Sequence, residues 1–422
     1  MIPDRLFHSD RRDLTVIRAY YFAYIGGVGF ISPFLNLFYV SLGLNGKQIG
    51  IFASISAVVG LLIAPMWVQE VRKSRSPRAF MQLAIAINAM AYILISNQVA
   101  FLPIAVIVFF QALAAAGVAP MSDSLAVKVA RTAGTGYGTV RVMGSLGWIF
   151  TVLSSGWLIQ HLGFKVGFAA TGLAYVLSAS LLFFVGPDPF TTQVVAGPPK
   201  AGLGIAIKRV LGDRVLWGFA LALIFIGFLN NGVTQFENVY LAQLGASKSV
   251  ISVAGIMSAL VELPCMILSD RVMRRFGPHR LLMAALVMYV LLRATVLALP
   301  AILTIIVVRF ATGLCFSMYT VSFVGLITSR TPAEETGTVL ALYSITLAGS
   351  VNIVASPLTG AAFDALGGRW LYAFAMAGYV AAFASLWATR PKPDAEQTNP
   401  AQAISAGAAM EAGAEGSPRT TD

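Results

Sequence analysis

Four ionisable side chains of this sequence lie inside long apolar stretches, where charge is costly and by default functional. Arg141 lies in YGTVRVMGSLGW (137–148), and Arg293, Arg309 and Glu262 lie in three other stretches. A guanidinium presents five donors in a planar fork, which suits a carboxylate or two adjacent hydroxyls. A carboxyl group withdrawn from water beside an arginine can bind and release a proton. These residue types therefore favour solute binding and proton transfer.

The elements that carry these charges are predicted to be membrane-spanning helices. Of the 422 residues, 57% are hydrophobic and only 11% are charged, whereas a soluble protein is closer to a quarter charged. Apolar runs of about 20 residues suit spanning helices and are too continuous for β-barrel strands. We expect an all-α polytopic membrane protein with twelve transmembrane helices, at 17–40, 48–69, 79–97, 101–127, 138–160, 165–186, 214–241, 249–269, 281–299, 301–325, 336–361 and 370–388.

The basic residues are concentrated on one side of these spans. Of 29 lysines and arginines, 22 fall in the termini and in the loops after spans 2, 4, 6, 8 and 10. Only Lys47, Lys165, Lys248 and Arg369 fall in the other loops. Cytoplasmic loops carry such an excess, so we expect an inner (plasma) membrane protein with both termini in the cytoplasm. The net charge of +11 then reflects topology and indicates no nucleic-acid partner.

The chain is expected to consist of two six-helix halves, 1–186 and 214–390. Residues 187–213 break the helical pattern with GPDPF, AGPPK and a basic amphipathic piece, which is typical of a cytoplasmic linker. Residues 391–422 are rich in Ala, Gly, Glu and Ser without an apolar period, and they are expected to form a disordered cytoplasmic tail.

The two halves are interpreted as pseudo-repeats. YVSLGLNGKQIGI (39–51) and YLAQLGASKSVISV (240–253) share a Tyr, a Leu-Gly pair and a following Lys, and GTV recurs at 138–140 and 337–339. A duplicated six-helix unit places a solute pathway between the halves, with the site near the midplane.

No cofactor, metal site or enzyme activity is expected. Cys265 and Cys315 lie in different spans, so neither a disulfide framework nor a metal site is indicated. The three histidines, His8, His161 and His279, lie at loops or helix ends, and no nucleophile–base set accompanies them.

The loop after span 8, SDRVMRRFGPHR (269–280), combines a helix-end aspartate, basic residues and a glycine turn, namely Asp270, Arg271, Arg275 and Gly277. This pattern resembles the signature loop of the major facilitator superfamily, where it latches helices on the cytoplasmic side. In the matching loop after span 2, VQEVRKSRSPR, the glycine and aspartate are missing and Glu70 is the acidic residue. The resemblance implies the major facilitator fold with a conformational latch.

Within that superfamily, most of residues 18–388 resemble the proton symporters around lactose permease and the 3-phenylpropionate permeases. The colinear motifs are GFISPF (29–34), IGIFASIS (49–56), APMSD (119–123), YGTVRVMGSLGW (137–148), TQFENVY (234–240), VELPCMILSDRVMRRFG (261–277) and ITS (327–329). The resemblance implies a proton-coupled secondary transporter.

The resemblance also gives Arg141 a partner. Asp123 falls on the span 4 carboxylate of lactose permease and Arg141 on its span 5 arginine, a pair that contacts substrate in that family; Ser145 and Trp148 align beside them. The alternative is that Arg141 snorkels to the surface. Counted from the turn at 134–136, the two residues differ by about six positions, or roughly 9 Å of helix rise.

For proton coupling, the resemblance places Arg309 on a span 10 lysine of lactose permease and Arg293 near its span 9 arginine. The positions of the histidine and glutamate that couple protons there are Thr312 and Cys315 here, which cannot carry a proton relay.

Glu262 is therefore the expected proton carrier, and Arg293 and Arg309 are the expected proton-coupling residues beside it. Asp123 is the alternative proton carrier. The alternative for each charge is a structural ion pair. Glu237, near the outer end of span 7, is interpreted as a gate or surface residue.

Further polar and aromatic residues of the spans are candidates for the solute pathway. Asn36, Gln111, Asn230 and Tyr319 are expected to contact substrate, and Asn231, Gln235, Asn238, Asn352, Tyr20, Tyr24 and Tyr343 are expected along the pathway.

These observations predict a monomeric transporter that takes up a small organic solute with a proton by alternating access. Three buried arginines against two buried acids, Asp123 and Glu262, leave the cavity positive. This favours an aromatic or other small carboxylate, and a sugar or nucleoside is the next choice. Two other interpretations stay open, namely a drug or metabolite efflux antiporter and a transporter-like membrane receptor.

Overall fold

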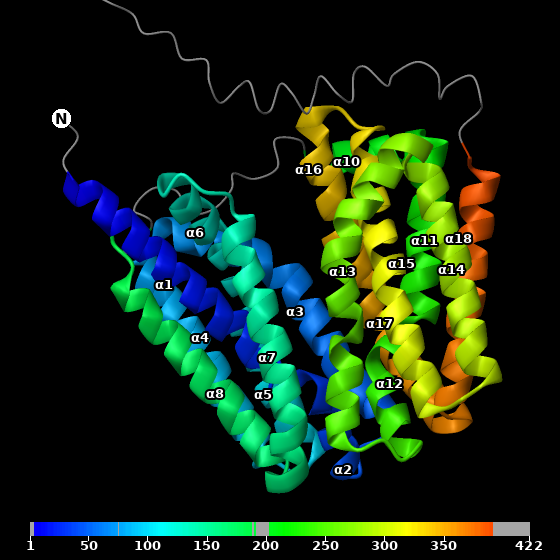
Figure 1. The fold of residues 1–422 in the computed structure, drawn as a ribbon, viewed down its shortest axis with the longest axis horizontal. Helices are drawn as coiled ribbons and strands as arrows, with labels where there is room; N and C mark the ends of the chain where they lie inside the picture. The colour runs from blue at the N-terminus through cyan, green and yellow to red at the C-terminus, as the bar shows by residue number, and fades with distance from the viewer. Residues whose placement is uncertain (1–3, 75, 188–189, 191–201, 391–422) are drawn as a thin grey trace, which may run out of the picture.

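The computed structural model describes the chain except residues 1–3, 75, 188–189, 191–201 and 391–422. The described part is helical throughout, without a strand, and forms a bundle of two halves (Figure 1). The expected tail and much of the expected linker lie outside the described residues.

The N-terminal half contains six spanning segments, three of them built from single helices. Its elements are α1 (Asp4–Val28), η1 (Ser32–Phe34), α2 (Leu35–Ser41), α3 (Gly46–Lys73), α4 (Pro77–Ile95), α5 (Phe101–Ala115), α6 (Val118–Thr132), α7 (Gly138–Leu162), α8 (Phe164–Leu181) and η2 (Leu182–Phe184).

The C-terminal half repeats this plan after a short amphipathic helix. Its elements are α10 (Leu203–Gly212), α11 (Arg214–Leu229), α12 (Asn231–Gln243), α13 (Lys248–Phe276), α14 (Pro278–Ala298), α15 (Ile302–Thr328), α16 (Ala333–Ala341), the π-helical turn η3 (Leu342–Leu347), α17 (Ala348–Leu366) and α18 (Gly368–Ala388).

The expected twelve-helix fold is confirmed. Eleven segments of the described part are long and apolar enough to cross a membrane. The remaining long helix is α13, with 29 residues, which packs between α7 and α15 and carries charged residues such as Glu262.

The first span of each half is interrupted near its middle. Between α1 and η1 the chain runs through Gly29, where a Cβ would lie only 2.3 Å from the hydroxyl oxygen of Thr151, so a larger residue would not fit without a shift. In the other half, Asn230 ends α11 and α12 begins at the next residue. Interrupted helices of this kind form the substrate sites of many transporters, because they expose polar groups inside the membrane.

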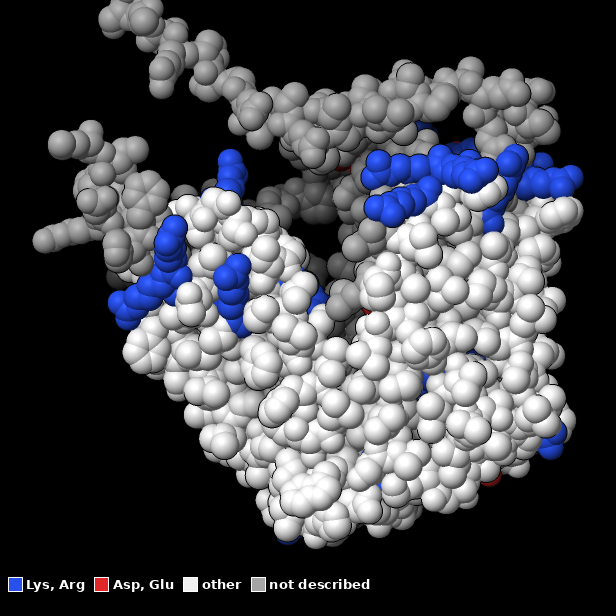
Figure 2. All heavy atoms as spheres, viewed as in Figure 1, with Lys and Arg blue, Asp and Glu red and all other residues white. Residues whose placement is uncertain are grey.

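In the described part of the chain, the main contacts between the two halves lie at one end of the bundle. At this distal end, opposite the linker, α3 packs against α17, α7 against α13 and α2 against α12. At the linker end, where α8 stops and α11 starts, the halves diverge (Figure 1). Figure 2 shows a hollow between them there, with lysines and arginines gathered around the same end. The conformation is therefore open at the linker end and closed at the distal end.

Part of the expected linker is the ordered helix α10. Ala206 and Val210 are buried against the C-terminal half. Arg209 donates two hydrogen bonds, of 2.8 and 3.2 Å, to the carboxylate of Glu335 at the start of α16. This ion pair holds α10 on the bundle and raises the pKa of Arg209 above its usual range.

Candidate functional site

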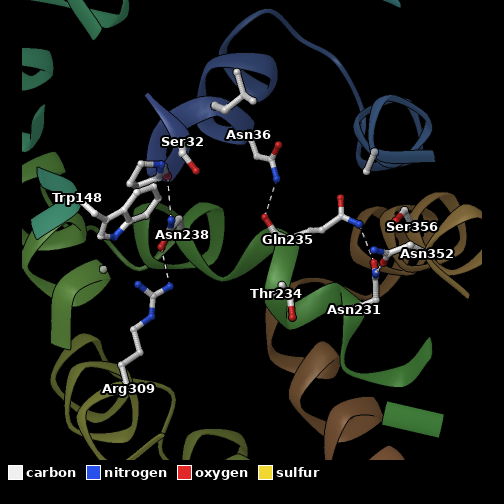
Figure 3. Close-up of a pocket in the computed structure, with 14 residues that line it drawn as sticks. Ser32, Asn36, Trp148, Asn231, Thr234, Gln235, Asn238, Arg309, Asn352 and Ser356 are labelled. Atoms are coloured by element: carbon white, nitrogen blue, oxygen red, sulfur yellow. Dashed lines mark hydrogen bonds between the residues drawn. The ribbon is translucent and has the colours of Figure 1, made fainter. Parts of the chain in front are cut away.

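A cavity of about 460 Å³ lies between the two halves, where the interrupted helices meet (Figure 3). Five side-chain amides dominate its wall, together with three hydroxyls, an indole and one guanidinium. The lining residues are Ser32, Pro33, Leu35, Asn36, Ala53, Trp148, Asn231, Thr234, Gln235, Asn238, Gly255, Arg309, Asn352 and Ser356.

The amides form a connected chain of hydrogen bonds. Gln235 donates to Asn231 Oδ1 at 2.7 Å, and Asn231 donates to Asn352 Oδ1 at 2.5 Å. Asn36 of the N-terminal half donates to the carbonyl of Gln235 at 2.7 Å and so connects this chain to the other half. The hydroxyl of Ser356, at the cavity wall, is buried without a hydrogen-bond partner in the described part.

A charged cluster adjoins the cavity through Arg309. Arg309 donates to Glu237 at 2.5 Å and to Asn238 Oδ1 at 2.6 Å. The same carboxylate accepts a hydrogen bond from Tyr372 at 2.6 Å and lies 3.8 Å from the guanidinium of Arg293. The cluster thus joins α12, α14, α15 and α18 around one acid.

The interpretation of Glu237 as a surface residue is wrong, because its side chain is only 11% exposed. The reason is that α12 begins at Asn231, which leaves Glu237 in the middle of that helix and facing α15. Glu237 offsets part of the charge of Arg293 and Arg309. The prediction of a positive cavity counted Asp123 and Glu262 as the buried acids. It omitted Glu237, the acid that Arg293 and Arg309 contact.

The structure does not bring Asp123 and Arg141 together. Asp123 Oδ1 accepts hydrogen bonds from the hydroxyls of Tyr21 and Tyr137, both at 2.7 Å. In the described part of the chain Arg141 forms no ion pair, and its electrostatic neighbours are Tyr137 and Glu262. Both side chains are exposed; Arg141 lies in the first turn of α7, at the linker end, and Asp123 lies near the middle of α6.

Glu262 is half-buried on α13, and its charge interacts with that of Arg141 on α7 in the other half. Among the described residues its carboxylate has no hydrogen-bond or ion-pair partner. Two charges predicted for different tasks, solute binding and proton transfer, thus act on each other across the interface between the halves.

The other expected contact residues divide into two groups. Asn36 and Trp148 line the cavity, and Asn230 adjoins it, since its amide donates to the Thr234 hydroxyl at 3.4 Å. Asn230 Oδ1 is buried without a partner in the described part.

Three expected contact residues lie outside the cavity wall. Ser145 is half-buried on α7, Gln111 lies beside Tyr92, and Tyr319 stacks on Phe323 with ring centroids 6.4 Å apart. Conversely, Ser32, Thr234 and Ser356 line the cavity and were not singled out from the sequence; a small hydroxyl inside an apolar span was their only signal.

The expected latch residues lie at the linker end. Arg271 and Arg275 are exposed on the last turns of α13, and Gly277 follows with a φ of 82°, which glycine adopts without strain. Glu70 is exposed near the end of α3. The side chain of Asp270 lies outside the described residues.

A twelve-helix bundle of two similar halves, with a polar cavity at their interface and a hollow between the halves at one end, defines a membrane transporter rather than an enzyme. The chain belongs to the MFS_1-like family of the major facilitator superfamily, whose family model matches residues 14–374. The expected membership of that superfamily is thereby confirmed.

Several characterised or named proteins are similar to this chain. The maltose permease of Geobacillus stearothermophilus is 28% identical over 274 residues, which are 64% of this chain and 68% of the permease. The probable 3-phenylpropionic acid transporter of Escherichia coli K12 is 23% identical, with coverages of 79% and 87%. A homologue of the multidrug efflux pump PmrA from Lactococcus lactis is 22% identical, with coverages of 79% and 83%.

Solved transporter structures share the fold. The nucleoside transporter NupG superposes with a TM-score of 0.76 at 16% identity, over 90% of this chain and all of that one. A bacterial homologue of the lysosomal transporter Spinster, in an inward-facing conformation, superposes with a TM-score of 0.66 at 15% identity, over 90% and 95% of the two chains.

Proposed function

We propose that this protein transports a small, neutral, hydroxyl-rich solute, of the sugar or nucleoside class, by proton-coupled alternating access. The observation that carries this proposal is the wall of the central cavity. Five of its side chains are amides, and the charge of its one arginine is already engaged by Glu237.

Amides suit hydroxyl groups better than carboxylates. Each amide side chain offers both donors and an acceptor, and each hydroxyl needs both. A carboxylate accepts only, so it would leave the acceptor oxygens of Asn36, Gln235 and their neighbours facing negative charge. A carboxylate would also compete with Glu237 for Arg309, at the cost of a buried ion pair.

Trp148 adds an apolar surface to this polar wall. An indole provides a flat face on which a sugar or nucleobase ring can pack, while its N–H stays available for a hydrogen bond. A volume of about 460 Å³ lies within the usual range of roughly 300–1,000 Å³ for small-molecule sites.

The similar proteins support this class without deciding it. Two of them are a maltose permease and a nucleoside transporter, whereas others are a 3-phenylpropionic acid transporter and an efflux pump homologue. The amide-lined wall favours a sugar or nucleoside, as in the first two proteins, over the carboxylate that the sequence favoured.

The proposal assigns the coupled proton to Glu262. Its carboxylate lacks a hydrogen-bond partner in the described part of the chain and acts electrostatically on Arg141 across the halves, so domain movement would alter its surroundings. The basic linker end faces the cytoplasm in this proposal, which makes the conformation inward-open.

A thermal-shift and calorimetric screen of the purified protein tests the solute class. Maltose, glucose, uridine and 3-phenylpropionate serve as probes, because a specific ligand stabilises the native state by mass action. We expect a concentration-dependent rise of Tm with a sugar or uridine and none with 3-phenylpropionate. Saturable binding of the carboxylate alone would overturn the neutral-solute proposal and restore the carboxylate interpretation.

A further inference from the structure

The closed distal end contains a carboxylate from one half that caps a helix of the other. Asp364, on α17, accepts hydrogen bonds from the backbone N–H groups of Gly46 at 2.7 Å and Lys47 at 3.1 Å. The next N–H of α3, at Gln48, is capped by the Asn45 side chain at 2.8 Å. The first turn of α3 thus relies on the C-terminal half for two of its otherwise unpaired donors.

Glycines bring the two helices close enough for this contact. A Cβ on Gly360 of α17 would collide with the backbone of Gly46, and a Cβ on Gly50 would collide with the backbone of Ser356. The α3 and α17 backbones therefore touch, and a side chain as short as that of Asp364 reaches the N-terminus of α3.

A positive charge makes the corresponding contact between α13 and α7. Lys248, at the start of α13, donates to the carbonyl of Ile159 in the last turn of α7 at 3.2 Å. The neighbouring Ser249 donates from its backbone and its hydroxyl to Gln160 Oε1, at 3.2 and 2.9 Å. The ammonium also lies 4.4 Å from the ring centroid of Phe164.

Both charges match the dipoles of the helices that they meet. An anion is stabilised at a helix N-terminus and a cation at a helix C-terminus. Asp364 and Lys248 belong to the C-terminal half, and both helix ends belong to the N-terminal half. Neither contact is a salt bridge between side chains, so neither follows from matching acidic with basic residues in the sequence.

We propose that Asp364 and Lys248 are two charge–helix clasps that hold the distal end closed and set the equilibrium between the two access states. This inference rests on the proposed alternating access. When the distal end opens, both clasps break. The N–H groups of Gly46 and Lys47 and the ammonium of Lys248 must then be hydrated, whereas the Ile159 carbonyl keeps its hydrogen bond from the N–H of Gly163. Removing either charge favours the distal-open state.

Distances between spin labels in the full-length protein in lipid nanodiscs test the proposal. Labels at Leu162→Cys and Leu299→Cys, two exposed distal positions in different halves, report distal opening. A second pair, Thr132→Cys and Thr328→Cys, reports linker-end closing. The native cysteines are replaced by Cys265→Ser and Cys315→Ala.

Asp364→Asn and Lys248→Met should each raise the distal-open population about two- to tenfold. The double variant should raise it by about the product of the two factors, because the sites are separate. Longer distal distances should appear together with shorter linker-end distances in the same samples.

Asp213→Asn is the matched control. Asp213 also caps a helix N-terminus, accepting from the N–H groups of Val215 and Leu216, but the cap lies within one half. Its loss should lower stability without shifting either distance distribution. A double clasp variant that opens the distal end no more than Asp213→Asn overturns the proposal.

The same measurements separate the clasps from the proposed function. If the spin-label distance distributions shift while no sugar or nucleoside binds, the clasp proposal is supported and the proposed solute class is wrong. If solute transport is demonstrated while the distributions stay unchanged, the clasps fail and the transport function stands.

Discussion

Arg309 donates hydrogen bonds to Glu237 at 2.5 Å and to Asn238 at 2.6 Å. Asn238 in turn donates to the carbonyl of Pro33 in the other half at 2.8 Å. The guanidinium that reaches the cavity is therefore held in place, and its charge is engaged by an acid behind it. Through Asn238, Arg309 is also connected to the backbone of Pro33 in the N-terminal half. This connection breaks when the two halves move apart.

Glu237→Gln should strongly destabilise the protein. The substitution leaves Arg293 and Arg309 buried without their shared acid, and breaking a buried ion pair from one side typically costs about 3–5 kcal/mol. Thermal unfolding in detergent measures the effect. Glu335→Gln, which breaks the exposed pair with Arg209, should lower Tm much less, and equal losses would show that the Glu237 cluster is not structurally important.

Glu237→Gln should also shift selectivity. With Arg309 released, its guanidinium becomes available to an anionic ligand in the cavity. We expect 3-phenylpropionate to gain measurable affinity in the variant, as judged by calorimetry on protein that is still folded. No gain in carboxylate binding would mean that Glu237 does not control the charge of the site.

Trp148→Ala should weaken solute binding about tenfold, since stacking and apolar contact on an aromatic face contribute roughly 0.5–1.5 kcal/mol beyond area burial. Trp148→Phe should retain most of the affinity. Trp157→Ala serves as a control because Trp157 lies on the same helix and is 59% exposed. Equal affinities for Trp148→Ala and Trp157→Ala would place the solute elsewhere.

Glu262→Gln should abolish accumulation of solute against its gradient and spare exchange, which needs no net proton movement. Proteoliposomes with an imposed pH gradient measure the first, and counterflow without a gradient measures the second. If the variant still accumulates solute, Glu262 is structural and Asp123 becomes the next candidate. Wild-type uptake that ignores the pH gradient would contradict proton coupling altogether.

Asp123 should be energetically coupled to Tyr21 and not to Arg141. Double-mutant cycles of Asp123→Asn with Tyr21→Phe should show a coupling of about 0.5–3 kcal/mol in unfolding free energy, as expected for hydrogen-bonded neighbours. The cycle with Arg141→Met should be additive within about 0.5 kcal/mol. Strong coupling to Arg141 would indicate that another conformation brings the pair together, as the resemblance to lactose permease implies.

The sequence by itself determined the spans, the division into halves and the superfamily. A helix that crosses a bilayer needs about 20 apolar residues and must satisfy its backbone internally, so composition along the chain is sufficient to locate it. The polar residue Asn36 could also be assigned to the pathway, because an exposed polar group in lipid is unfavourable, and Trp148 could be assigned to it from the resemblance to lactose permease.

Tertiary structure decided which polar residues meet. Glu237 and Arg309 are 72 positions apart, and their contact depends on the interruption at Asn230 and on the rotation of α12 about its axis, neither of which apolar length specifies. Asp123 meets two tyrosines instead of Arg141 because the register of α6 against α1 and α7 is set by packing. Spans follow from each segment's own transfer free energy, whereas the site follows from contacts between segments that are far apart in the chain.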